Sequence, residues 1–303
     1  GDLMAGRLMV RLTTQCNSGC AHCTIADIAH LPERSAEEVW AEIQAGRQRG
    51  CDELVFMRGE ATLRRELLKL VRRSRDIGYG HIQIQTNARM LAYPEYVDKL
   101  TGAGVTFWEV SFFGHNAGLH DLIDDTEGAF DQALAGLQNL VAAGCPLMVT
   151  VPVIRRNHTA LPDIVRFLHG QGVSRVQLNF SRPVKVGPQW QTEVLVSLDE
   201  CSGFIREALR EARALGITGE TEAVPLCHLD PEDAFGADMV EDFSRHQVVD
   251  VHRVESDLTD HRETMRPRAE PCTTCSVADR CPRTWSAYQE LYGTWELRPL
   301  SAP

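Results

Sequence analysis

The sequence predicts an α/β protein with a partial, TIM-type (β/α)6 barrel over residues 1–180 and a smaller α+β domain over residues 181–303. Two observations predict this fold. Strand-like runs alternate with amphipathic helical stretches through the first part of the chain, which is typical of parallel strands joined by right-handed helical crossovers. The alternation gives six units, fewer than a closed barrel needs, so we expect an open barrel. Near Ser181 the alternation is lost, which marks the second domain.

The strands and helices of the barrel follow from periodicity and turn signals. Strands are expected over residues 7–14, 53–57, 81–86, 105–111, 147–153 and 175–179. Helices are expected over about 35–49, 63–77, 93–103, 130–141 and 161–169. Ser35 and Glu38 have the form of a capping box at the start of the first helix. In the second domain a helix is expected at about 199–215, while the acidic segment 230–260 carries few structural signals.

The composition limits the classes of protein to consider. Hydrophobic residues make up 43% and charged residues 24%, as in soluble globular proteins. There is no signal-peptide pattern and no run of eighteen apolar residues, so we expect a cytoplasmic protein with no membrane partner. The net charge of −11 argues against nucleic-acid binding, which needs excess Lys and Arg. A solvated acidic surface is the commoner explanation of this charge, and a cationic small-molecule substrate is the alternative. Ten cysteines in such a chain favour metal or redox chemistry over disulfides.

Three cysteines directly follow the first strand. Cys16, Cys20 and Cys23 stand in TTQCNSGCAHC with the spacing C-x3-C-x2-C. Cysteine thiolates are the usual ligands of iron–sulfur clusters, and three of them leave one iron of a [4Fe–4S] cluster open. A zinc site or three unrelated buried cysteines would also explain the spacing taken alone.

This motif resembles the signature of the radical SAM superfamily, in which the open iron chelates the amino and carboxylate groups of S-adenosylmethionine. The resemblance implies reductive cleavage to a 5'-deoxyadenosyl radical, which abstracts a substrate hydrogen. It also implies a flavodoxin or ferredoxin that re-reduces the cluster. His22 stands where the family usually has an aromatic residue that packs on adenine, and we expect its ring to take that place.

Later strand ends resemble further cofactor motifs of that family, and strand ends build the active site in parallel β/α folds. The run RGEATL at 58–63 resembles GGEPTL, with Arg58 in place of a glycine. Gly59 allows close backbone approach, and Glu60 would accept a hydrogen bond from the cofactor ammonium group. The sequence QTN before Ala88 resembles the family's TNG. The remaining residues that the resemblance assigns to S-adenosylmethionine are Thr86, Asn87, Ser111, Ile154, Arg155 and Asn157.

A second cysteine group lies in the C-terminal domain, with Cys272, Cys275 and Cys281 in PCTTCSVADRC and Cys227 before them. It resembles the twitch, or SPASM-like, auxiliary-cluster region of radical SAM enzymes. The number of cysteines implies one auxiliary [4Fe–4S] cluster, hence two clusters in all, with a structural zinc as the alternative. Cys227 is either the fourth ligand of a cluster that accepts an electron in a dehydrogenation, which we favour, or a free catalytic thiol that returns a hydrogen atom in an epimerisation.

Four aromatic residues follow this group with helical spacing. They are expected to form one helical face against the cluster, and they are Trp285, Tyr288, Tyr292 and Trp295. Cys51, Cys145 and Cys201 lie at strand and helix starts and are expected to be structural.

The resemblance therefore predicts an enzyme that dehydrogenates or epimerises a small metabolite, such as an amino sugar or aminocyclitol of antibiotic biosynthesis. Compact members with one auxiliary cluster, including the aminoglycoside and aminocyclitol dehydrogenase–epimerase group, resemble this chain. Asp121 and Asp124 would suit a cationic substrate, although a solvated or helix-capping cluster is the alternative. Asn179 at the sixth strand end is also expected to face the substrate. A peptide maturase and a non-catalytic metal-binding scaffold are the two rival hypotheses.

Overall fold

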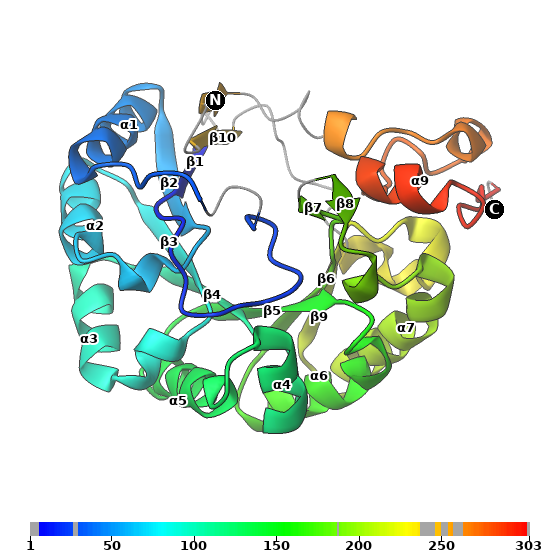
Figure 1. Cartoon of the computed structure of the whole chain (residues 1–303), viewed down its shortest axis with the longest axis horizontal. Coiled ribbons are helices and arrows are strands. Elements are labelled where there is room, and N and C mark those ends of the chain that lie inside the picture. Colours follow the sequence, from blue (N-terminus) through cyan, green and yellow to red (C-terminus); the bar gives the residue numbers. More distant parts are fainter. Residues whose placement is uncertain are drawn as a thin grey trace.

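The fold is a curved, nine-stranded sheet with helices along its outer side (Figure 1). The computed structural model describes residues 6–26, 30–186, 188–236, 246–249, 254–256 and 263–301. Strand order is β11-β10-β1-β2-β3-β4-β5-β6-β9, and all neighbours pair in parallel except β10 and β11. The strands are β1 (Gly6–Arg11), β2 (Cys51–Met57), β3 (His81–Thr86), β4 (Phe107–Ser111), β5 (Leu147–Val153), β6 (Arg175–Phe180), β9 (Thr218–Glu222), β10 (His246–Val249) and β11 (Val254–Ser256).

Helices join the parallel strands and cover their outer face. They are α1 (Ala36–Gln48), α2 (Leu67–Asp76), α3 (Pro94–Ala103), α4 (Ala117–Asp124), α5 (Ala129–Ala142), α6 (Leu161–Gly170) and α7 (Leu198–Ala214). A further helix, α9 (Ser286–Tyr292), lies in the C-terminal segment. The capping box of Ser35 and Glu38 at the start of α1 is present as predicted. No helix among the described residues has both the length and the apolarity to cross a membrane.

The predicted open barrel is confirmed, but the sheet extends beyond the six strands expected. The helix expected near 199–215 is α7, and it leads into β9, which pairs in parallel with β6. The strand–helix alternation therefore continues past Ser181. The sequence of β9, TGETE, lacks the aliphatic residues that mark a buried strand, so hydrophobicity could not reveal it. The division of the chain at residue 180 stays a prediction, and much of the acidic segment 230–260 lies outside the described residues.

Strands β3 and β6 bury one face against the helices and turn the other inward. In β3 and β6 buried residues alternate with half-buried ones, and the buried set includes Ile82, Ile84, Val176 and Leu178. The inward positions of β3 and β4 are polar, with Gln83 and Gln85 beside Glu109. A closed barrel fills its interior with apolar side chains. This open barrel has a polar interior instead, which suits a polar ligand.

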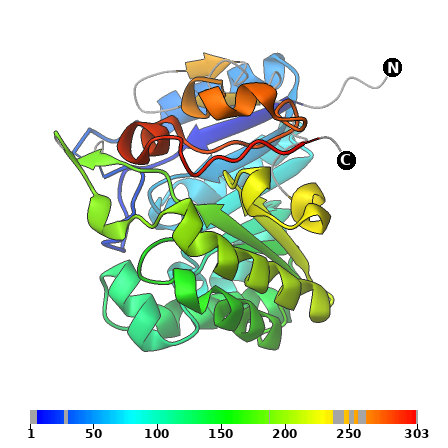
Figure 2. The same ribbon diagram turned by 90° about the vertical axis from the view of Figure 1, so that its right-hand side faces the viewer.

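The C-terminal segment packs on the barrel near the start of α7. The Tyr288 hydroxyl accepts a hydrogen bond from the Leu198 amide at 2.8 Å and donates one to the buried Glu296. Helix α9 lies beside the hairpin of β7 (Lys185–Val186) and β8 (Gln189–Trp190) in both views (Figure 1 and Figure 2), with Lys185 Nζ 3.2 Å from Glu290 Oε1.

The predicted aromatic face on one helix is wrong in part. Tyr288 and Tyr292 stack within α9, with ring centroids 4.8 Å apart. Trp285 precedes the helix and donates from Nε1 to the Phe180 carbonyl at 2.6 Å. Helix α9 ends at Tyr292, so Trp295 lies beyond it and is 69% exposed. Gly293, with a φ of 78° and a ψ of −165° that only glycine adopts readily, turns the chain out of the helix before Trp295.

Candidate active site

A cleft of about 350 Å³ lies at the carboxyl ends of the parallel strands. The loop after β1 supplies one wall, and residues from β2, β3, β4, β5, β6 and β9 or from the loops after them supply most of the rest. Strand ends that are far apart in sequence meet here because the strands are parallel. The sequence-predicted site residues that line the cleft are Cys16, Cys20, His22, Cys23, Gly59, Glu60, Thr86, Asn87, Ser111 and Asn179.

The three cysteines lie in the cluster loop, residues 12–26, and their thiols face a common space. Burial is the main cause that raises the pKa of Cys20, and the neighbouring charges of Asp124, Cys16 and Cys23 raise it further. Burial likewise raises the pKa of Cys16, with Cys23 among the charges that add to the effect. Three thiolates this close repel one another unless a cation lies among them. The donor set therefore fits an iron–sulfur cluster with three protein ligands.

The cluster loop is tied to the rest of the site through Asp124. The Gly19 amide donates to the Asp124 carbonyl at 2.9 Å, and Ser18 Oγ donates to its carboxylate at 2.8 Å. Arg89 forms an ion pair with the same carboxylate at 3.6 Å and also donates to the Asn17 carbonyl. This buried aspartate, at the end of α4, holds the middle of the loop.

The predicted substrate role of Asp121 and Asp124 does not fit their positions, since neither lines the cleft. Asp124 anchors the cluster loop. Asp121 accepts hydrogen bonds from the amides of Gly128 at 2.8 Å and Phe130 at 2.7 Å, which satisfies the first turn of α5. Asp121 therefore has the helix-capping role that was the alternative from sequence. Asp124 instead holds the cluster loop, which is far from it in sequence.

Glu60 is the buried acid of the cleft, with 1% of its surface exposed. Burial raises its pKa, and hydrogen bonds from Thr62, the Asn87 amide and Thr86 oppose the increase. Its carboxylate accepts from Thr86 Oγ1 and the Asn87 amide, both at 2.8 Å. These neutral donors orient the group but supply no countercharge, so an ammonium group in the cleft would bind it well.

Two residues beside the cleft hold left-handed backbone conformations without being glycine. Arg58 has φ of 65° and Ala88 has φ of 62°. These are the two positions at which the resembled motifs carry glycine, and a side chain there costs roughly 1–2 kcal/mol. Both turns nevertheless keep the left-handed conformation that glycine would adopt there. Arg58 also reaches the cluster loop through a hydrogen bond to Thr24.

His22 supplies a neutral ring to the cleft. Burial lowers its pKa to about 4, so the imidazole is uncharged near pH 7. The ring meets Phe113 edge to face, with centroids 5.0 Å apart. A neutral ring in this position fits the expected role of His22, which is to replace the usual aromatic side chain, better than the role of a base that titrates near neutral pH.

Three residues that the resemblance assigns to the cofactor do not line the cleft. Ile154 is buried behind Phe113. The amide group of Asn157 is fully buried and donates to the carbonyls of Phe113 at 3.1 Å and Pro152 at 2.8 Å, so it braces two strand ends. Arg155 lies on the surface, 3.5 Å from Glu200.

Two acids that no sequence motif indicated also line the cleft, Glu109 and Glu222. Glu109 accepts hydrogen bonds from Gln83 at 2.7 Å, Gln85 at 3.0 Å and Thr150 at 3.2 Å. Its position in the alternating strand FWEVS was an available signal. Glu222 ends β9, the strand that the sequence concealed, and accepts a hydrogen bond from Asn179.

The second cysteine group lines a separate cavity of about 20 Å³ in the C-terminal segment, with Cys227 among the four. Burial raises the pKa of Cys227 to about 11, and the charges of Cys281 and Cys272 add to the effect. The Leu226 amide lies 3.4 Å from Cys281 Sγ, and the Leu300 amide lies 3.4 Å from Cys275 Sγ. Amide donors of this kind stabilise sulfur ligands.

No group of three or more His, Cys, Asp and Glu side chains in the described residues is arranged to hold a single metal ion. The ligands of a cubane cluster stand further apart than those of one ion, because each thiolate binds a different iron.

The sequence profile of the Radical SAM superfamily matches residues 10–168, which is more than half of the chain. The chain belongs to the radical SAM superfamily. Membership implies a [4Fe–4S] cluster and S-adenosylmethionine, and the residues of the cleft fit both groups. Cys16, Cys20 and Cys23 would hold the cluster, and Glu60 would bind the ammonium group of the cofactor.

Curated relatives of this radical SAM protein differ in activity. An AdoMet-dependent heme synthase of Methanosarcina barkeri is 34% identical over 148 residues, which are 48% of this chain and 42% of that protein. A probable GTP 3',8-cyclase of Sulfurisphaera tokodaii is 28% identical over 182 residues, 59% of this chain and 57% of that protein. The chain thus spans about half the length of the curated relatives it matches.

Among solved structures, Streptococcus suis SuiB bound to S-adenosylmethionine has a similar fold. The TM-score is 0.66 at 14% identity, over 95% of this chain and 74% of SuiB. The structure of native anSMEcpe with bound AdoMet and the Cp18Cys peptide gives a TM-score of 0.57 at 13% identity over 70% of this chain and 62% of that chain. At such low identity the likeness concerns the fold.

Proposed function

We propose that this radical SAM enzyme is an oxidoreductase that dehydrogenates a polar, amine-bearing small metabolite such as an amino sugar or aminocyclitol. The observation that carries the proposal is the shared cavity of Cys227, Cys272, Cys275 and Cys281. Four thiols suit an auxiliary [4Fe–4S] cluster of the twitch type without an open iron. When bound, the two clusters and S-adenosylmethionine supply radical formation and a one-electron acceptor.

The position of Cys227 favours dehydrogenation over epimerisation. Its thiol lines the cavity of the second cysteine group and is not among the residues that line the cleft. A thiol that returns a hydrogen atom must touch the substrate, whereas a ligand need not. A dehydrogenation removes a hydrogen atom, a proton and an electron from the substrate. S-adenosylmethionine would supply the radical that takes the atom, and a cluster held by Cys227, Cys272, Cys275 and Cys281 would supply the acceptor of the electron. Cys227 therefore acts as a ligand in this proposal.

The polar interior of the cleft supports an amine-bearing substrate. Glu109 takes the place of Asp121 and Asp124 as the acid that would bind the amine, since Glu222 already pairs with Arg266 at 3.0 Å. Glu109 accepts three hydrogen bonds from uncharged side chains, and burial raises its pKa. A substrate ammonium group would supply a countercharge to this carboxylate, while Asn179 could bind a hydroxyl group.

The proposal includes a flavodoxin or ferredoxin as the reductant and the cytoplasm as the location. A peptide maturase is the second candidate. Supporting it, the SuiB structure bound to its precursor peptide SuiA shares the fold with a TM-score of 0.59 at 13% identity, over 72% of this chain and 49% of SuiB.

Anaerobic reconstitution followed by turnover tests the proposal. The wild type should bind about eight irons, and Cys227→Ala should lose about four of them. Cys201→Ala is the matched control, because Cys201 is buried in α7 away from both cysteine groups. With dithionite, S-adenosylmethionine and 2-deoxystreptamine, a product two mass units lighter is expected.

Other outcomes separate the alternatives. Full iron content in Cys227→Ala with lost turnover would favour the hydrogen-donor role. No reaction with any aminocyclitol, together with reaction of a peptide substrate, would favour the maturase.

A further inference from the structure

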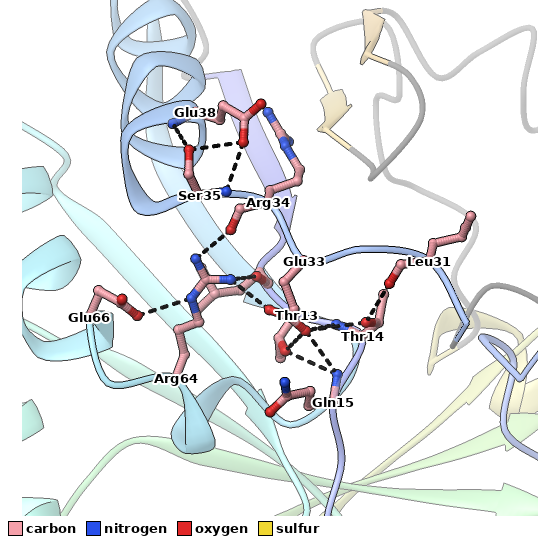
Figure 3. Close-up of polar contacts among 11 residues, drawn as sticks. Thr13, Thr14, Gln15, Leu31, Glu33, Arg34, Ser35, Glu38, Arg64 and Glu66 are labelled. Carbon is pink, nitrogen blue, oxygen red and sulfur yellow. Dashed lines mark hydrogen bonds and ion pairs between the residues drawn. The ribbon is translucent and has the colours of Figure 1, made fainter.

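One carboxylate, that of Glu33, holds the chain where the cluster loop begins. Its Oε1 atom accepts hydrogen bonds from Thr13 Oγ1 at 2.5 Å, the Thr14 amide at 2.8 Å and the Gln15 amide at 3.2 Å. Figure 3 shows these donors converging on the carboxylate. The next residue is Cys16, so this contact fixes the backbone immediately before the first cysteine.

The same backbone segment supports the Gly59–Glu60 motif from its other side. The Glu60 amide donates to the Gln15 carbonyl at 2.7 Å. Gly59 lies so close that a Cβ atom there would be 2.4 Å from the Thr13 carbonyl oxygen and 2.6 Å from that of Gln15. Residues 13–15 thus connect Glu33 with the carboxylate that faces the cofactor site.

Arg64 closes this arrangement into a ring. Its guanidinium lies 2.7 Å from Glu33 Oε2 and also donates to the carbonyls of Leu12 at 3.1 Å and Arg34 at 2.6 Å. The Arg64 side chain is only 10% exposed. It follows the Gly59–Glu60 motif along the chain, so both ends of the motif are linked to the start of the cluster loop. Charge-assisted hydrogen bonds are about twice as strong as neutral ones, which makes the ring stiff.

Glu33 is ionised at neutral pH. Burial alone would raise its pKa, but hydrogen bonds from Thr13, Thr14 and Gln15 outweigh burial and lower it. Because a carboxylate only accepts hydrogen bonds, it can satisfy these donors and Arg64 together. A glutamine at this position has one acceptor oxygen and one NH2 group. It could accept hydrogen bonds from residues 13–15 or from Arg64, but not from both.

We propose that Glu33 is a positioning residue which, with Arg64, fixes the Cys16 end of the cluster loop relative to Glu60. It thereby sets the fit of S-adenosylmethionine between the open iron and the Glu60 carboxylate. Glu33 acts through the backbone of residues 13–15, and it lies outside the set of residues that line the cleft. The inference rests on the chemistry of the superfamily and is independent of the proposed substrate.

The test compares Glu33→Gln with Glu66→Gln. Glu66 also pairs with Arg64, at 3.1 Å, on the side away from the cluster loop (Figure 3). Each variant removes one carboxylate from Arg64, and only Glu33→Gln disturbs the loop. In metal-free protein, hydrogen exchange at the Thr14 and Gln15 amides, which donate to Glu33, should become about tenfold faster in Glu33→Gln, the local opening expected when a charge-assisted hydrogen bond is lost. Exchange at the amide of Val149, a fully buried residue of β5, reports global unfolding.

The second readout uses reconstituted protein. At equal iron content, Glu33→Gln should need about tenfold more S-adenosylmethionine to change the EPR spectrum of the reduced cluster. If Glu33→Gln melts at a lower temperature but leaves the ratio of Thr14 to Val149 amide exchange and this titration at wild-type values, its role is merely structural and the proposal is overturned. If Glu33→Gln does not fold, Arg64→Lys is tested instead. Lysine keeps the positive charge but cannot make both hydrogen bonds to the carbonyls of Leu12 and Arg34, and the same two measurements apply to it. An inactive wild type would contradict the proposed function without affecting the hydrogen-exchange comparison.

Discussion

Replacing Gly59 by alanine tests the geometry of the cleft most sharply. The residue has φ of +59°, and an added Cβ would lie 2.4 Å from the Thr13 carbonyl oxygen and 2.6 Å from that of Gln15. Both neighbours are backbone atoms, so neither can rotate away. The left-handed conformation costs roughly 1–2 kcal/mol, and overpacking adds roughly 1–3 kcal/mol. The free energy of unfolding should therefore fall by about 2–5 kcal/mol, or about 4–10 °C in melting temperature.

The assay combines thermal melting, followed by circular dichroism, with calorimetric titration of S-adenosylmethionine. Gly59→Ala should melt earlier and bind the cofactor more weakly, because the strain falls between the cluster loop and Glu60. Gly80→Ala is the matched control, since an added Cβ there meets open space. A Gly59→Ala protein that melts and binds like the wild type would refute the close approach of the two loops.

Three further changes have distinct expected outcomes. Asn157→Ala should lower the free energy of unfolding by about 2–4 kcal/mol in urea titration, because two buried carbonyls lose their donor; a strong loss of cofactor affinity at full stability would instead show that Asn157 binds the cofactor. Burial, opposed by Asp121 and reinforced by Arg89, lowers the pKa of His120 to about 4. The folded protein therefore keeps this imidazole neutral, so stability is retained above about pH 6.5 and falls by about 2 kcal/mol as the pH drops to about 5; a His120→Gln protein with the same acid slope would contradict this. Glu109→Gln should weaken binding of 2-deoxystreptamine about tenfold and leave that of uncharged scyllo-inositol unchanged, and equal losses for both would exclude a charge contact.

The sequence could predict the parts of the site that depend on short spacings. Cys16, Cys20 and Cys23 follow a recognisable strand, and Gly59 and Glu60 follow the next one. Parallel strands bring such ends together whatever their distance in sequence. For this reason ten predicted residues meet in one cleft.

The roles that the sequence could not predict depend on contacts across the fold. Asp124 meets Ser18, 106 positions away, and a local acidic pattern cannot reveal that partner. Asn157 lies at the expected strand end, but its amide is used by two carbonyls. Glu222 was missed because its strand has the composition of a loop.

Formation of 5'-deoxyadenosine is the most direct test of the central claim that the cleft holds an open-iron cluster beside S-adenosylmethionine. Reconstituted wild-type protein with dithionite should produce it. The Cys16→Ala, Cys20→Ala, Cys23→Ala triple variant should produce none, while retaining the about four irons of the auxiliary group. Deoxyadenosine formation by the triple variant, or its absence from an iron-loaded wild type, would contradict the account.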